Sequence, residues 1–365
     1  MKTAKELLIL LTKPLFAFRK KAPLPSYVLG RLLVMGVMLF LLGLAVFGLM
    51  ALAPGDIVSQ VMIQQLMSSS EGRESVSTAQ RDLSGEWAEA QRKELGLDQP
   101  FYVQYVRWLK QVVVNHDLGV SLISRAPVSF LIGTRLLNSV LLNIISLVLI
   151  TFFSFLLGVY FSSKAGTKVD VAVSFFALAL HAFPGILLLI LLQLFASLTG
   201  LFPVTAYPPF PFRDAPLRFV FSYSHHVFLP LLASFLGGIG GTLRMIRATM
   251  LDQLGQPYIT SLRSRGIAEW RIYLAHAFRN TLNPYITGSA NMLAGLFSGS
   301  LILEIIFAYP GIGRLMYEAV MQQDINLVLA NVMFISFLVL LGMLISDISL
   351  ALVDPRIRYG KDGLA

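Results

Sequence analysis

The chain alternates between long apolar runs and shorter polar connections. About 20 consecutive apolar residues are needed for a helix to cross the hydrocarbon core of a bilayer. Six runs reach that length, namely residues 32–53, 136–161, 169–199, 227–246, 285–307 and 325–352. We therefore predict an all-α polytopic membrane protein with six transmembrane helices.

Two of these runs contain residues that should bend a helix or let helices pack closely. Pro184 and Gly185 interrupt the third run, where we expect a kink that faces the interior of the helix bundle. In the fourth run, the glycine pairs at 237–238 and 240–241 should let neighbouring helices approach closely. We therefore expect tight helix packing along the fourth run.

The polar connections divide the chain into five parts. We predict a cytoplasmic interfacial segment over 1–27, a first transmembrane helix over 28–56, an external region with a helical insertion over 57–135, a five-helix transmembrane core over 136–352, and a cytoplasmic tail over 353–365. In the first part, the apolar run 7–11 is too short to span a membrane. Its lysine-rich flanks favour a helix on the membrane surface that ends at Pro23 and Pro25.

Lysine and arginine decide the orientation. Lys164 and Lys168 lie in the short connection after the second run, and several arginines lie in residues 257–284. Since short cytoplasmic loops carry an excess of these residues, both connections and both termini should be cytoplasmic. Residues 201–226, rich in proline and aromatic side chains, should form an irregular external loop, and residues 308–324 should be external too.

Composition narrows the class further. Hydrophobic residues make up 56% of the 365 residues and charged residues 13%, which is outside the range of soluble domains. The net charge of +9 could indicate nucleic-acid binding, but positive-inside topology and anionic lipid headgroups explain it better in so apolar a chain. The chain has no cysteine, so it forms neither disulfides nor thiolate metal sites.

Few residues carry chemistry. The chain has no Walker A motif and no H-E-x-x-H motif, and we expect no catalytic residue, metal or cofactor in it. His181 lies within the third run, and an ionisable residue there is a candidate for a transport pathway, as is the break at Pro184. A single hydrogen bond to a neighbouring helix would explain His181 equally well. Tyr105 and Trp108 suit either a lipid-facing belt or packing under a loop.

The polar stretch 257–284 is longer than a connection between two spans requires. We predict two short helices that are separated at Gly266, because glycine tolerates positive φ and weakens helices. Leu274 and Phe278 are four residues apart and should share a face of the second helix. The alternative is a solvated loop with one amphipathic turn on the membrane surface.

Several motifs occur together in a recognisable order. They are RLL and APGD at the two ends of the first run, ELGLDQPFYVQYVRWL at 94–109, DLGVS at 117–121, the stretch 257–284 with its R-x-R-G-I and HAFRN elements, E-I-I-F-A-Y-P-G-I-G at 304–313, Asp324, and DPRI at 354–357. Together they resemble the permease subunits of ABC importers of the dipeptide, oligopeptide and nickel group. The resemblance implies the type I ABC importer transmembrane fold.

The same resemblance implies partners. A second homologous permease, two cytoplasmic ATPase subunits that bind ATP and Mg, and an external solute-binding protein would complete the transporter in a bacterial or archaeal cytoplasmic membrane. The stretch 257–284 would dock into an ATPase groove as a coupling helix. The residues expected to carry that coupling are Ile259, Leu262, Arg263, Arg265, Gly266, Ile267 and Arg279. Leu262 and Ile267 would fill the groove, although Leu262 and Ser264 stand where the family usually has alanine.

The motif at 304–313 is expected to form an external gate. The residues expected to contact the binding protein or the second permease are Glu304, Tyr309, Pro310, Gly311, Gly313 and Met316. The alternative is a structural plug without direct contact to substrate. The expected substrate is a peptide, and nickel chelates or other small solutes are alternatives. A secondary transporter or channel and an intramembrane hydrolase are the rival classes.

Overall fold

The computed structural model describes residues 23–52, 98–282 and 300–353, together with the isolated positions 89, 93, 285 and 296. The predicted interfacial helix before residue 23, most of the external insertion, most of the fifth run and the C-terminal tail therefore lie outside the described residues. The described chain is helical and contains no β-strand; its one isolated bridge joins Val120 and Pro127. The prediction of an all-α protein is confirmed.

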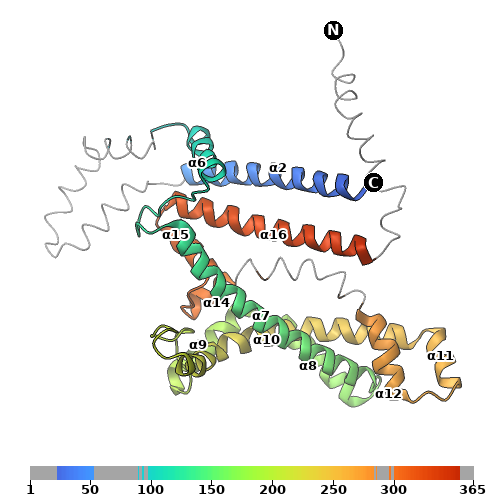
Figure 1. The fold of residues 1–365 in the computed structure, drawn as a ribbon. Coiled ribbons are helices and arrows are strands. Elements are labelled where there is room, and N and C mark those ends of the chain that lie inside the picture. The colour runs from blue at the N-terminus through green and yellow to red at the C-terminus, as the bar shows by residue number, and fades with distance from the viewer. Residues whose placement is uncertain are drawn as a thin grey trace, which may run out of the picture. The chain divides into compact units, whose positions relative to one another are not determined.

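The chain forms two compact units, and each is described by itself. The first comprises residues 1–133 with 316–365, and the second comprises residues 134–315. In the first unit, α2 (Pro23–Leu52) packs along α16 (Ile325–Val353), as the blue and red helices of Figure 1 show. The short helix α6 (Phe101–Asn115) packs against α2.

The second unit is built around one long helix, α10 (Pro216–Leu254). Helices α8 (Lys168–Ala182) and α9 (Gly185–Thr199) pack against it. The remaining helices of this unit are α11 (Pro257–Ser264), α12 (Glu269–Arg271), the π-helix η1 (Ile272–Ala277) and α14 (Leu301–Ile306). Two helices, α7 (Val128–Ser162) and α15 (Ile312–Met321), begin in one unit and end in the other.

Four of the described helices are long and apolar enough to cross a bilayer, and the pair α8–α9 makes a fifth if it counts as one span. The fifth predicted run, 285–307, lies largely outside the described residues. Its end differs from the prediction, because Ser300 is non-helical (φ −115°, ψ 80°) and the short helix α14 begins only after it. The fourth span is longer than predicted: α10 begins at Pro216, so residues 216–226 are helical rather than an irregular loop.

The predicted kink at Pro184 is a full break. Helices α8 and α9 meet at 90°. Phe183, the residue before the proline, is extended (φ −70°, ψ 131°), because the proline ring disfavours the helical conformation of the residue that precedes it. Pro184 then caps α9 in an extended conformation (φ −60°, ψ 116°).

The predicted glycine packing on α10 is confirmed for three of the four residues. A Cβ on Gly240 would collide with the carbonyl oxygen of Ala177 on α8, and one on Gly238 would lie 2.6 Å from Ile150 Cδ1 on α7. A Cβ on Gly241 would lie 3.3 Å from the His181 ring, whereas one on Gly237 would meet nothing within 4 Å. The helices therefore approach α10 where it lacks side chains.

Candidate functional sites

The first candidate site is the polar stretch after α10, which we call the 257–284 loop and which is described through residue 282. It folds as the sequence predicts, into α11 and a second helical part that starts at Glu269, with a break between them. Gly266 has a positive φ of 74°, and its N–H donates to the carbonyl of Arg263 over 3.0 Å. The break therefore falls where only glycine adopts the backbone conformation without strain.

An ion pair joins the two sides of this break. Arg263 donates from Nε to Glu269 Oε1 over 2.8 Å and from Nη2 to Oε2 over 3.2 Å. These hydrogen bonds lower the pKa of the Glu269 carboxyl below its ordinary value and raise that of Arg263. Ala268, at the N-cap of α12, makes no side-chain capping bond. The Arg263–Glu269 ion pair therefore connects the start of α12 to α11, although the N-cap residue of α12 makes no capping bond.

The three apolar residues expected to carry the coupling pack fully or partly inside this chain. Ile259 is fully buried, together with Met250 of α10 and Ile272 of η1. Leu262 and Ile267 are half-buried and pack against the same cluster. The Ile259 side chain closes the loop onto the end of α10, and the role of Ile259 in coupling to an ATPase stays a prediction.

A different pair of apolar side chains faces outward. Trp270 is 62% exposed and Leu274 is 54% exposed, and they lie four residues apart. The Arg271 guanidinium lies 5.2 Å from the centre of the Trp270 ring. Phe278, which the sequence paired with Leu274, instead packs edge-on against Phe155 with 5.3 Å between ring centres. The i, i+4 spacing of Trp270 and Leu274 was the signal that could have identified this pair.

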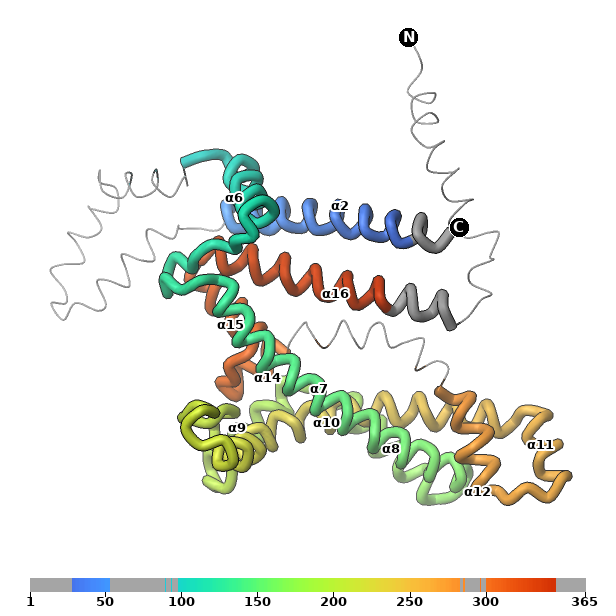
Figure 2. Tube along the Cα trace, viewed as in Figure 1, coloured from blue at the N-terminus to red at the C-terminus, as the bar shows by residue number. Residues whose placement is uncertain are grey.

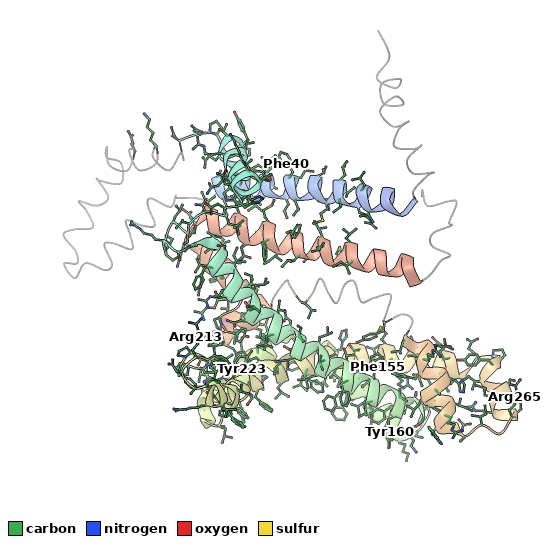
Figure 3. The ribbon with its side chains drawn as sticks, in the orientation of Figure 1. Phe40, Phe155, Tyr160, Arg213, Tyr223 and Arg265 are labelled. Atoms are coloured by element: carbon green, nitrogen blue, oxygen red, sulfur yellow. The ribbon has the colours of Figure 1, made fainter. Side chains whose placement is uncertain are left out.

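Arg263, Arg265 and Arg279 of the loop are all exposed. Arg263 forms the ion pair with Glu269. Figure 3 shows Arg265 at the outer end of the loop, beside α11. Figure 2 shows that the loop projects from the end of α10.

A buried ion pair ties α10 to α8 near this end. Arg247 donates from Nε and Nη2 to the two carboxylate oxygens of Asp170, each over 2.6 Å. Asp170 is 3% exposed and also accepts the N–H of Gly166 over 3.0 Å. A two-pronged pair of this kind fixes orientation as well as distance. Sequence reasoning missed this pair, because its two residues lie 77 positions apart.

The second candidate site is the motif at 304–315. Glu304 is 1% exposed, accepts a hydrogen bond from the Ser139 hydroxyl over 2.6 Å, and accepts the backbone N–H of Arg314 over 2.9 Å. The Ser139 hydroxyl in turn accepts the N–H of Ile312 over 2.8 Å. A Cβ on Gly311 would collide with the Glu304 carboxylate. The glycine therefore lets the backbone wrap around a buried carboxylate.

Tyr309 lies at the centre of a second set of bonds. Its hydroxyl donates to the carbonyl of Asn138 over 2.8 Å and lies 3.0 Å from that of Tyr223 on α10. The Asn138 amide donates to the carbonyl of Pro310 over 2.9 Å. Burial raises the pKa of the Tyr309 phenol. We call Glu304, Ser139, Asn138 and Tyr309, with the backbone of 310–314, the Glu304 cluster.

Four of the residues expected to form the external gate, Glu304, Tyr309, Gly311 and Gly313, are buried within the chain. Contact of this motif with a binding protein or a second permease stays a prediction. A buried carboxylate requires hydrogen bonds to its oxygens, and here the Ser139 hydroxyl of α7 and the Arg314 N–H of α15 supply them. The alternative of a structural plug is consistent with the burial of these four residues and stays a prediction as well. Pro310 and Met316 are half-buried.

A third set of contacts involves DLGVS and Asp324. The Ser121 hydroxyl donates to Asp324 Oδ2 over 2.6 Å, and Asp324 Oδ1 accepts the N–H of Leu327 over 3.2 Å. The Asn326 amide donates to the carbonyl of Val120 over 3.1 Å. Two motifs that the sequence analysis treated separately thus meet at the start of α16.

The His181 ring is exposed and packs beside Gly241 of α10. Its role in a pathway, like that of Pro184, stays a prediction. Among the described residues, no group of three or more histidine, aspartate or glutamate side chains could hold a metal ion.

The fold and these sites define a multi-pass α-helical membrane protein. Residues 152–359 match the family of the binding-protein-dependent transport system inner membrane component. The chain is 32% identical over 337 residues, 92% of this chain and 99% of the relative, to the oligopeptide transport system permease protein AppB of Bacillus subtilis (strain 168). It is 34% identical to a putative peptide transport system permease protein of Brucella abortus (strain 2308), covering 84% of this chain and 96% of that protein.

A third relative is the glutathione transport system permease protein GsiC of Salmonella paratyphi A, 29% identical with 92% of this chain and 99% of that protein covered. The chain therefore belongs to the family of inner-membrane permease components of binding-protein-dependent transport systems, in its peptide and nickel branch. The resemblance inferred from the sequence motifs is confirmed.

Proposed function

We propose that this chain is one permease subunit of an ATP-driven importer of peptides. The observation that carries the proposal is the family match over residues 152–359, which includes the whole 257–284 loop. The relatives named above are peptide, oligopeptide and glutathione permeases, which supports a peptide as the substrate class. A second homologous permease would complete the pathway, and an external binding protein would deliver the peptide.

The free energy for transport would come from ATP hydrolysis on other subunits. The sequence contains no Walker A motif, so ATP and Mg would bind to two separate ATPase subunits, and this subunit itself is not an enzyme. The ATPase must bind the loop differently in its open and closed states, because contacts of equal strength would shift no equilibrium. Ile259 packs the loop against the end of α10, and the Arg247–Asp170 pair joins α10 to α8, which supports transmission of that movement to the spans.

The docking surface we propose is centred on Trp270 and Leu274. Both are more than half exposed, and burying a side chain of this size stabilises a contact by about 1.5–3 kcal/mol. Arg265 and Arg279 would meet acidic residues at the rim, where exposed ion pairs are worth about 0–1 kcal/mol. Leu262, Ile267, Gly266 and Arg263 would shape the loop rather than dock.

The test uses the assembled transporter in proteoliposomes. Trp270→Ala and Leu274→Ser should lower peptide uptake and the coupling of uptake to ATP hydrolysis, or release the ATPase subunits. Thr260→Ala, an exposed change on α11, is the matched control and should behave as wild type. Wild-type uptake and hydrolysis in both variants would overturn the docking surface. Uptake driven by an ion gradient without ATPase subunits would overturn the function itself.

The topology is tested separately. We propose that both termini and the 257–284 loop are cytoplasmic in a bacterial cytoplasmic membrane. Ser264 is exposed and the chain has no cysteine, so Ser264→Cys offers a single labelling site. An impermeant thiol reagent should label this variant in inverted vesicles and not in intact cells; labelling in intact cells would overturn the topology.

A further inference from the structure

Helices α8 and α10 meet along a face of small and apolar residues. A Cβ on Gly240 would collide with the carbonyl oxygen of Ala177, and Ala177 lies in one buried cluster with Ile239 and Leu243 of α10. Apolar packing is non-directional, and packed helices slide past each other by small amounts in many conformational changes. The apolar contact therefore holds the two helices together but opposes sliding along their axes only weakly.

The Arg247–Asp170 pair adds a directional bond to this contact. Arg247 is half-buried and donates to both carboxylate oxygens of Asp170, each over 2.6 Å. The planar guanidinium fork matches the spacing of the two oxygens in one relative position. Sliding of α8 along α10 would misalign both bonds at once. The pair thus opposes the movement that the apolar contact permits.

Asp170 is fixed to the beginning of α8. Its backbone N–H donates to the hydroxyl of Thr167, the N-cap of α8, over 3.3 Å. Its Oδ2 accepts the N–H of Gly166, which has a positive φ of 80° in the turn between α7 and α8. The carboxylate is therefore bonded into the first turn of α8 and into the turn that precedes it.

Arg247 is fixed to the end of α10 that carries the 257–284 loop. It lies on α10 between Ile246 and Met250, which are both buried. These two side chains share a cluster with Ile259 of α11 and Ile272 of η1. Since α10 is continuous from Arg247 to its end, movement of the loop would displace Arg247 as well.

Helix α8 joins the ion pair to the break at Pro184. Asp170 lies in its first turn, and its last residue, Ala182, lies about 18 Å further along at 1.5 Å per residue. There α9 continues at 90° to α8. A hydrogen-bonded helix transmits movement as a rigid element, so an axial displacement of the first turn of α8 would reach the break.

We propose that Asp170 and Arg247 are positioning residues for transport. The pair keeps α8 in axial register with α10 while the loop moves, so that the movement reaches the break between α8 and α9 instead of being lost as sliding. This role rests on the proposed function, in which the ATPase subunits move the loop. Neither residue contacts peptide or ATP in this role, and both act through the position of α8.

The variants are compared in the assembled transporter in proteoliposomes, as peptide taken up per ATP hydrolysed. Asp170→Asn keeps an oxygen for the Gly166 N–H but removes the charge that Arg247 binds. Arg247→Lys keeps the positive charge but replaces the fork by a single ammonium group. Both should lower uptake per ATP several-fold, while the ATPase subunits stay bound and hydrolyse ATP. Lys168→Gln, an exposed change in the same turn of α8, is the matched control and should keep the wild-type ratio.

A double variant and a distance measurement separate positioning from stability. If the two residues act as one pair, Asp170→Asn with Arg247→Lys should lower the ratio no further than Asp170→Asn alone. The register is followed with spin labels at Val171→Cys on α8 and Ala248→Cys on α10, which are both exposed, with partner subunits made free of cysteine. The label separation should be the same in nucleotide-free and ATP-bound transporter, and it should differ between these states once Asp170→Asn is added.

Two results would overturn the positioning role. An unchanged uptake per ATP in the assembled variants, even at lower total rates, would mean that the pair only stabilises the fold. Equal label separation in both states of the Asp170→Asn transporter would mean that α8 keeps its register without the pair. If Asp170→Asn fails to assemble, Arg247→Lys decides by the same criteria. Failure of the proposed function is distinct, because wild-type transporter would then show no ATP-dependent peptide uptake.

Discussion

The Ser139 hydroxyl of α7 donates a hydrogen bond to the Glu304 carboxylate of α14 over 2.6 Å, across 165 residues of sequence. The same hydroxyl accepts the N–H of Ile312, so one small side chain joins α7, α14 and the start of α15. The backbone N–H of Arg314 donates to the other oxygen of this carboxylate, and Glu304 is 1% exposed. The turn at Pro310 therefore packs around a buried, hydrogen-bonded carboxylate.

Ser139→Ala should destabilise the protein. It removes one donor to Glu304 and one acceptor for Ile312, and each unsatisfied buried group costs about 1–3 kcal/mol. The measurement is thermal unfolding of the detergent-solubilised protein, with Ser163→Ala as control. Ser163 is exposed and bonds only locally, to the carbonyl of Tyr160. A wild-type melting temperature for Ser139→Ala would contradict the role given to this bond.

Asp324→Ala should loosen the start of α16. Asp324 caps this helix and accepts the Ser121 hydroxyl, and loss of an N-cap costs about 1 kcal/mol. Hydrogen exchange of the first turn of α16 and of residues 117–121 should become faster together. Asp324→Asn keeps a capping oxygen and should change exchange much less. Faster exchange in only one of the two segments would argue against their connection.

Gly240→Ala should disturb the contact between α8 and α10. The new Cβ would meet the backbone carbonyl of Ala177, which cannot turn aside as a side chain could. Overpacking of this kind costs about 1–3 kcal/mol. Gly237→Ala is the matched control, since its Cβ would meet nothing within 4 Å. The two variants are compared by thermal unfolding, and equal melting temperatures would refute close packing at Gly240.

The Arg263–Glu269 pair should respond to acid. The hydrogen bonds from Arg263 lower the pKa of Glu269 in the folded protein. The stabilising contribution is therefore complete above the unfolded pKa of about 4.3 and is lost as the pH falls through the lower, folded value. The ¹⁹F resonance of fluorotryptophan at Trp270, identified with Trp270→Phe, should report the titration of its neighbour.

In Arg263→Gln, the midpoint of this titration should move upward towards the ordinary value for glutamate. Arg265→Gln removes an exposed charge of the same loop and serves as the control, with only a small effect. An unchanged midpoint in Arg263→Gln would mean that the pair does not form in solution.

The sequence by itself determined the class of the protein, the approximate spans and the break at Gly266. These features depend on local properties: the length of an apolar run, the demand of a positive φ, and the restriction that a proline places on its predecessor. The order of motifs was likewise readable without coordinates, and the family match agrees with it.

Only the tertiary structure decided which side of each helix is covered. Tyr105 is buried and Tyr102 exposed on one short helix, and Ile259 is buried while Trp270 is exposed in one loop. In a membrane protein, lipid and protein interior are both apolar, so the pattern of hydrophobic residues does not distinguish an inner face from an outer one. The partners of Glu304, Asp170 and Asp324 lie 77 to 203 residues away, and only packing brings them together.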